Sequence, residues 1–157
     1  MAARELSRRA TRHRIAACAL VCCLGAALPV VAAETDGAPT PEQFHRTVQK
    51  FPYVASRERA AMIRAGLARV KHCANKATVR SLLGEPDFGR ASRGPKGPGE
   101  QWIGSSWVYY LSKMDSGTNR NDSRAEIFFD TGDRAVWIVP TRIEGAREIG
   151  AFGDRCG

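Results

Sequence analysis

The chain has 157 residues, of which 43% are hydrophobic and 25% are charged. This length suits one domain, and the composition excludes a long disordered tail, a collagen-like repeat and a protein with several membrane spans. The formal net charge is +8, from 24 Lys and Arg against 16 Asp and Glu, and it is unevenly placed along the chain.

Residues 1–33 have the pattern of a secretory signal. Five arginines within the first 14 residues precede an uncharged apolar run, residues 15–28, and small residues lead up to Ala33. A basic segment, a short apolar segment and a small-residue site are typical of a cleaved signal peptide. The apolar run is shorter than the roughly 20 residues that a spanning helix needs. We therefore expect export to the periplasm with cleavage near Ala33, and an uncleaved N-terminal anchor is the alternative.

The predicted signal carries much of the positive charge. Residues 34–157 keep 19 Lys and Arg against 15 Asp and Glu, a net charge of +4. Nucleic-acid binding is therefore not expected, because it depends on positive charge gathered on the folded surface. Lipoprotein anchoring is not expected either, because Cys18 follows Arg14 closely and precedes most of the apolar run.

Only two of the five cysteines, Cys73 and Cys156, lie outside the predicted signal. An even pair in an oxidising compartment predicts a disulfide, and a loop of this length would gain about 4–5 kcal/mol in the chain-entropy model. Free thiols or a metal site are the alternatives. No metal is expected, because the chain has no Cys-x-x-Cys pattern and the adjacent His72 and Cys73 are not expected to place both side chains on one ion.

Three helices are predicted in the first half of the exported chain. Pro41 follows a Thr and precedes Glu-Gln, a capping box that begins a helix over residues 40–50. Apolar residues at helical spacing predict a second helix over residues 56–70. Asn75 as N-cap and Gly84 as the terminating glycine bound a third.

Residues 89–104 are predicted to form a loop. They contain several Gly and Pro residues and show no hydrophobic periodicity. The basic side chains Arg90, Arg93 and Lys96 could hold an anionic group, and a plain solvated loop is the alternative.

Three strands are predicted over residues 106–112, 124–130 and 134–139, followed by a tail over residues 141–157. The order of helices and then strands indicates an α+β fold. We expect one domain, residues 34–157, with two to three N-terminal helices packed on one face of a three-stranded antiparallel β-meander and a disulfide-tethered C-terminal tail.

Three motifs occur in a characteristic order. Residues 70–87 contain a helix ending in Leu-Gly-Glu-Pro, Trp107-Val108-Tyr109 follows, and Ile127-Phe128-Phe129-Asp130 precedes a glycine turn. This order resembles the BamE (SmpA/OmlA) family of small bacterial envelope proteins. The resemblance implies helices on one face of a three-stranded antiparallel sheet. It also implies a scaffold role at the outer membrane, with peripheral contact to that membrane.

Catalysis is not expected. The exported chain has two histidines, His45 and His72, and no Ser lies in a nucleophile motif. An enzyme needs a nucleophile, a base or a metal in converging positions. We therefore expect no catalytic residue, no cofactor and no small-molecule substrate.

Protein binding is the expected function. Alternate residues of a strand point to opposite faces, so Phe128, Trp137 and Val139 should lie on the sheet face away from the helices. Either Val108 and Tyr110 or the set Trp107, Tyr109 and Leu111 joins them, and Tyr110 is the candidate taken for the partner surface. An exposed aromatic patch marks a partner surface, unless residues 89–104 or 141–151 cover it. We expect a non-catalytic envelope scaffold that binds a protein and is linked to outer-membrane assembly or integrity. A periplasmic inhibitor or immunity-type protein that blocks an enzyme is the alternative.

Overall fold

The computed structural model describes residues 37–93 and 103–157. The predicted signal peptide, residues 1–33, and Lys96 of the predicted basic loop lie outside these ranges. Within them, no helix is long and apolar enough to cross a membrane.

Local capping signals set where the three helices begin. The Thr40 hydroxyl accepts a hydrogen bond from the Gln43 N–H at 3.2 Å, and the Thr40 N–H donates to Gln43 Oε1 at 2.6 Å. This is the predicted capping box. The predicted Asn75 and Gly84 likewise bound the third helix, with Gly84 at a φ of 78°. The helices are α1 (Pro41–Thr47), α2 (Arg57–Leu67) and α3 (Lys76–Leu83).

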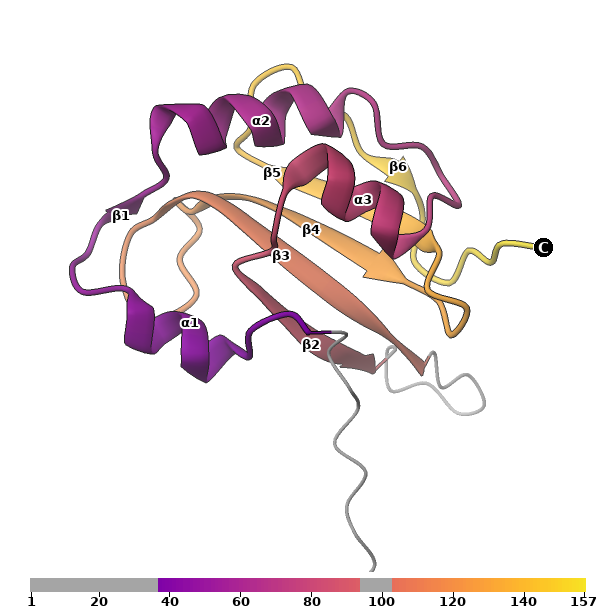
Figure 1. Ribbon diagram of the computed structural model, residues 1–157, viewed down its shortest axis with the longest axis horizontal. Helices are drawn as coiled ribbons and strands as arrows, with labels where there is room; N and C mark the ends of the chain where they lie inside the picture. Colours follow the sequence, from indigo (N-terminus) through magenta and orange to yellow (C-terminus); the bar gives the residue numbers. More distant parts are fainter. Residues whose placement is uncertain (1–36, 94–102) are drawn as a thin grey trace, which may run out of the picture. The chain divides into compact units, whose positions relative to one another are not determined.

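The sheet is antiparallel and has six strands within the described residues. Its order is β1-β3-β4-β5-β6, and β2 also pairs with β3. β1 pairs with the end of β3 and β2 with its beginning, so the two lie in line along one edge of β3 (Figure 1). The strands are β1 (Tyr53–Val54), β2 (Phe88–Arg93), β3 (Ile103–Lys113), β4 (Ser123–Phe129), β5 (Ala135–Thr141) and β6 (Ile149–Gly150).

The predicted three-stranded meander is therefore wrong in its number of strands. The three predicted strands are present as β3, β4 and β5, and three more join them. β2 occupies the first part of the predicted loop 89–104 and pairs along its whole length with β3. β1 and β6 have two residues each, which is too short for a period-2 pattern to show in the sequence.

The prediction that the helices share one face is also wrong. Residues from α2 and α3, such as Ile63 and Leu83, form a core with Trp107 and Tyr109 of β3. Phe44 of α1 packs instead with Val108, Tyr110 and Phe88. Because alternate residues of β3 point to opposite faces, α1 covers the face opposite α2 and α3, as Figure 1 shows.

Gly66 allows α2 and α3 to approach closely. A Cβ atom at this position would lie 2.5 Å from the Leu82 carbonyl oxygen and 2.8 Å from Leu83 Cδ1. Real Cβ atoms do not approach backbone this closely, so the helix crossing requires a residue with no side chain. A glycine inside a helix costs about 1 kcal/mol relative to alanine, and here that cost is offset by the packing of α2 on α3.

Candidate functional site

The sheet face opposite α2 and α3, called here the outer face, carries two rows of side chains. Strand register aligns Arg90, Ser106, Phe128 and Trp137 across β2, β3, β4 and β5 in one row. The neighbouring row is Phe88, Val108, Glu126 and Val139. α1 packs on the part of this face formed by β2 and β3, so the part on β4 and β5 is the candidate surface.

Tyr110 lies beneath α1 and not on the candidate surface. Its side chain is only 3% exposed. Its ring stacks on the ring of Phe44, with centroids 5.6 Å apart and planes 10° apart. The expectation that Tyr110 contacts a partner is therefore corrected: its ring is a core element that holds α1 to the sheet.

Phe128 and Trp137 do meet on the outer face, as predicted. Their rings stack with centroids 4.8 Å apart, and both residues are half-buried. Phe152 adds a third ring, placed edge-on to Trp137 at 5.7 Å, and it is 39% exposed. We call Phe128, Trp137 and Phe152 the aromatic ladder. Val139 lies half-buried on the same face, in the neighbouring row.

The C-terminal segment covers part of this face. Besides the Phe152 ring, the Glu148 carboxylate reaches the indole of Trp137 and accepts a hydrogen bond from Nε1–H at 2.6 Å. The alternative that residues 141–151 cover the aromatic face thus holds in part. The sequence indicated Phe152 only weakly, as the single aromatic residue of the tail.

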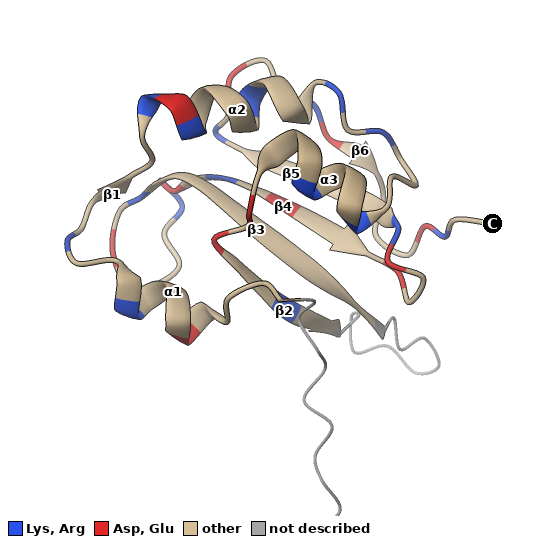
Figure 2. Ribbon diagram, viewed as in Figure 1, with Lys and Arg blue, Asp and Glu red and all other residues tan. Residues whose placement is uncertain are grey.

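A buried carboxylate lies beside the aromatic ladder. Glu126 is 6% exposed and accepts hydrogen bonds from Arg90 Nη2 and from the Ser106 hydroxyl, the latter at 3.0 Å. Arg124 Nη2 lies 4.0 Å from its other oxygen. Figure 2 shows that the strands carry few charged residues compared with the helices and connecting segments. Arg90, Glu126 and Arg124 are therefore among the few charged residues that the strands carry.

Two residues of the predicted basic loop lie on a strand. Arg90 is on β2, and its guanidinium is engaged with Glu126. Arg93 is the last residue of β2, and Lys96 lies outside the described residues. The sequence could not show the Arg90–Glu126 pair, because the two residues are 36 positions apart and meet only through strand register.

Asp87, the residue before β2, ties β3 to α2. Its Oδ2 accepts the Tyr110 N–H at 2.5 Å, and its Oδ1 lies 3.0 Å from Arg59 Nη2. Burial raises the pKa of this carboxyl group above its ordinary value, although Arg59 and the Tyr110 amide act in the opposite direction. A hollow between α1 and the segment before it borders Asp87, but both carboxylate oxygens are already engaged in the fold.

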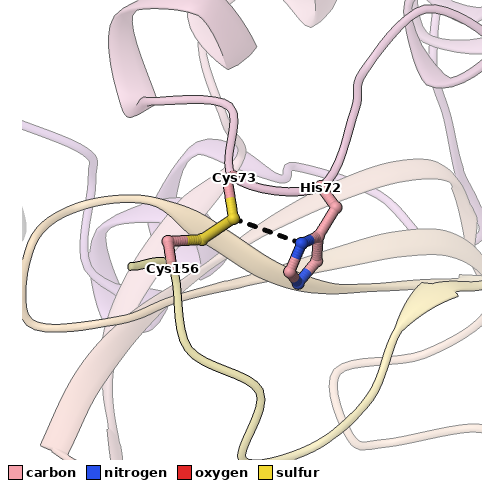
Figure 3. Close-up of side chains that lie close together, drawn as sticks. All are labelled: His72, Cys73 and Cys156. Carbon is pink, nitrogen blue, oxygen red and sulfur yellow. Dashed lines mark hydrogen bonds between the residues drawn. A yellow bond between two sulfur atoms is a disulfide. The ribbon is translucent and has the colours of Figure 1, made fainter.

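Cys73 and Cys156 form the predicted disulfide, with Cα atoms 5.6 Å apart. The imidazole of His72 points toward this bond, as Figure 3 shows, and its Nδ1 lies 3.2 Å from Cys73 Sγ. His72 Nε2 lies 3.6 Å from Asp154 Oδ2. The adjacent His72 and Cys73 were not expected to place both side chains on one ion. The two side chains lie close together here, with Cys73 at a φ of 65°.

The comparisons with known proteins give no family. No family model matches the chain, and no curated protein or solved structure is significantly similar to it. The resemblance to the BamE family therefore stays a prediction based on the order of short motifs.

Proposed function

We propose that this chain is an exported, non-catalytic scaffold of the bacterial cell envelope that binds a partner protein through the outer face. The observation that carries the proposal is the aromatic ladder, Phe128, Trp137 and Phe152, with Arg90 in the same cross-strand row as its first two members. α1 packs over another part of this face, which limits the proposed contact to β4, β5 and the C-terminal segment.

The residue types of this surface support protein binding. Aromatic residues and arginine are enriched in the cores of protein interfaces, and Trp and Arg are frequent hot spots. Phe152 exposes 39% of its surface, and Trp137 and Phe128 are half-buried beside it. A partner would bury the rest of this apolar area, with Arg90 at its margin.

The buried acids support a scaffold more than an enzyme. Asp87 holds a backbone amide and Arg59, and Glu126 is bonded to Arg90 and Ser106. Asp122, fully buried, accepts hydrogen bonds from the backbone of the β3–β4 connection and lies 3.6 Å from Lys113 Nζ. Each carboxylate therefore has a role in holding the sheet together.

The envelope location rests on the signal pattern of residues 1–33 and on the disulfide. Disulfides persist mainly in oxidising compartments, such as the bacterial periplasm. The link to outer-membrane assembly or integrity rests on the motif resemblance alone. An inhibitor of a soluble periplasmic enzyme would use the same surface, so the experiment must separate the two.

The test is a pull-down of the processed protein from the cell envelope, with identification of co-purifying proteins by mass spectrometry. The Trp137→Ala variant is run beside it. Val54→Ala is the matched control, because Val54 is an exposed apolar residue, at 67%, on β1 and outside the ladder. Outer-membrane assembly proteins that are captured by the native protein and the control, but lost with Trp137→Ala, would support the proposal.

Two results would contradict it. Capture of a single soluble enzyme, lost in the same variant, would establish the inhibitor function in place of the scaffold. Equal capture by all three proteins would exclude the aromatic ladder as the binding surface.

A further inference from the structure

We propose that His72, Cys73 and Cys156 form a binding site for one Zn²⁺ ion when the disulfide is reduced, with Asp154 orienting the imidazole. The ligand atoms of the two cysteines and the histidine all lie within 4.8 Å of one another. The three side chains come from the loop between α2 and α3 and from the C-terminal segment, and they converge in Figure 3.

The donor set suits zinc. Zn²⁺ is held by thiolate sulfur at about 2.3 Å and by imidazole nitrogen at about 2.0–2.1 Å, in a tetrahedron. The ligand atoms of such a tetrahedron are roughly 3.4–3.8 Å apart. His72 Nδ1 already lies 3.2 Å from Cys73 Sγ. Once the sulfur–sulfur bond is cleaved, the two sulfur atoms would have to move apart to reach this spacing, and water would take the fourth position.

Asp154 provides the support that a zinc-bound histidine normally has. If Nδ1 binds the ion, Nε2 carries the proton, and its N–H donates a hydrogen bond to an acceptor. Asp154 Oδ2 lies 3.6 Å from Nε2. A carboxylate in this position fixes the tautomer and raises the basicity of the ligand nitrogen. The carboxylate is itself held, because Oδ2 accepts the Ala151 N–H at 2.8 Å.

The cysteine-bearing loop is held in place without the disulfide. The Cys73 N–H donates to the Ala135 carbonyl, and the Ala135 N–H donates to the Ala74 carbonyl, both at 2.8 Å. These two hydrogen bonds tie the loop to the start of β5. The position of His72 and Cys73 therefore depends on the sheet as well as on the sulfur–sulfur bond.

The C-terminal half of the site is anchored in a similar way. β6 pairs Ile149 and Gly150 with β5, and the Asp154 N–H donates to the Ala151 carbonyl at 3.1 Å. At Gly150, a Cβ atom would lie 3.0 Å from Cδ2 of His72. The glycine thus gives the imidazole the space that it occupies.

Zinc binding and the disulfide exclude each other. A dithiol reductant supplies two electrons and two protons, the Cys73–Cys156 bond breaks to give two thiols, and the dithiol becomes a disulfide. Each thiol then loses its proton as it binds Zn²⁺, so two protons are released per ion. Reoxidation of the cysteines would expel the ion. The site therefore belongs to the reduced chain, before the disulfide forms or after a dithiol has opened it.

The test uses the whole processed protein. The protein is reduced with a dithiol, and the dithiol is then removed in the absence of oxygen. Co²⁺ serves as a spectroscopic probe, and Zn²⁺ is measured by competition with a chromophoric chelator. We expect one equivalent of Co²⁺ with thiolate-to-metal absorption, displaced by Zn²⁺. Oxidised protein should bind at least a hundredfold more weakly. Cys156→Ser should lose the charge-transfer band, and Asp154→Asn should weaken Zn²⁺ binding by about 10–100-fold.

His72→Ala is the decisive variant, and His45→Ala is its control, because His45 is on α1. His72→Ala should bind at least tenfold more weakly than the control. Circular dichroism of the reduced protein shows whether the sheet persists. Equal affinity in the two histidine variants, equal binding by oxidised protein, or loss of the fold on reduction without recovery on adding Zn²⁺ would each overturn the proposal.

Discussion

The indole Nε1–H of Trp137 donates a hydrogen bond to Glu148 at 2.6 Å, which joins β5 to the segment that follows it. The same indole contacts two further rings, Phe128 on β4 and Phe152 in the C-terminal segment. Trp137 therefore joins the sheet to the tail on the outer face. This position makes it the first target for separating binding from stability.

Replacing Trp137 with alanine should reduce partner capture at least tenfold, because hot-spot residues cost about 2 kcal/mol or more of binding free energy when truncated. The free energy of unfolding, measured in urea, should fall less than in Phe129→Ala. Phe129 is fully buried against Trp107, and truncating a buried Phe costs about 3–5 kcal/mol. A loss of stability in Trp137→Ala equal to that in Phe129→Ala, with unchanged capture, would make Trp137 a core residue.

Removing Arg90 should destabilise the protein through Glu126. The Arg90→Ala change leaves a buried carboxylate without its nearest cation, which is costly, although Arg90 is half exposed and solvent limits the effect to about 1 kcal/mol. Adding Glu126→Gln should recover part of this loss, because a neutral amide is easier to bury. Urea unfolding of the single and double variants measures the loss of stability and its recovery. If the double variant is less stable than Arg90→Ala, Glu126 stabilises the fold without its arginine.

Gly66→Ala should lower the free energy of unfolding by about 1–3 kcal/mol, the usual cost of overpacking. The added methyl group would meet the Leu82 carbonyl at 2.5 Å, and the resulting strain should exceed the gain in helix propensity of about 1 kcal/mol. Ala65→Ser, on an exposed position of the same helix, is the control and should change stability by about 0.5 kcal/mol at most. A more stable Gly66→Ala protein would show that α2 and α3 can separate at little cost.

Asp87 and Asp115 should titrate on opposite sides of the ordinary aspartate pKa. Burial raises the pKa of Asp87, whereas hydrogen bonds from Asn119 and the Gly117 amide lower the pKa of the exposed Asp115. Carboxyl chemical shifts followed by NMR against pH report both groups in one sample. An Asp87 midpoint below that of Asp115 would refute the assignment of a desolvated carboxylate.

The raised pKa of Asp87 has a defined effect on stability. Between the unfolded and folded pKa values, the native state binds more protons at Asp87 than the unfolded state does. Its contribution to stability is therefore fully present below the unfolded pKa and is lost as pH rises through the folded one. The free energy of unfolding, measured in urea across this pH window, should decline less with rising pH in Asp87→Asn than in the native protein.

Cys156→Ser should destabilise the chain by up to about 4–5 kcal/mol, the chain-entropy value for a loop of this length. The variant also removes the covalent tether of the residues after β6, which include Phe152, so the tryptophan fluorescence of the native state should change with it. Arg155→Ser, next to Cys156 and exposed, is the control and should leave both properties unchanged. Unaltered stability in Cys156→Ser would mean that the disulfide adds nothing to the pairing of β6 with β5.

The features that the sequence predicted correctly depend on residues close together in the chain. Thr40 and Gln43 cap α1 from three positions apart, and Asn75 and Gly84 bound α3 in the same local way. The Cys73–Cys156 pair is an exception, because its two residues are far apart in the chain. It could be predicted because only two cysteines remain outside the predicted signal.

The features that the sequence did not predict depend on tertiary pairing. β2 contains Gly89 and Arg90 and has little strand character of its own, and it is a strand because β3 provides its hydrogen bonds. Helical periodicity shows which side of α1 is apolar, but not which face of the sheet it will cover. For this reason, Tyr110 was expected at the surface and lies in a core.

The placement of β1 and β2 along one side of β3 leaves little room for strands of other molecules. Between these two strands, the Tyr110 amide is bonded by the Asp87 side chain. On the opposite side of the sheet, the Cys73–Ala74 loop and β6 cover the first half of β5, and Pro140 beyond them has no N–H to offer. The edge of β3 and the first half of β5 are thus covered against edge-to-edge pairing with another chain, a property that would suit the exported protein proposed above.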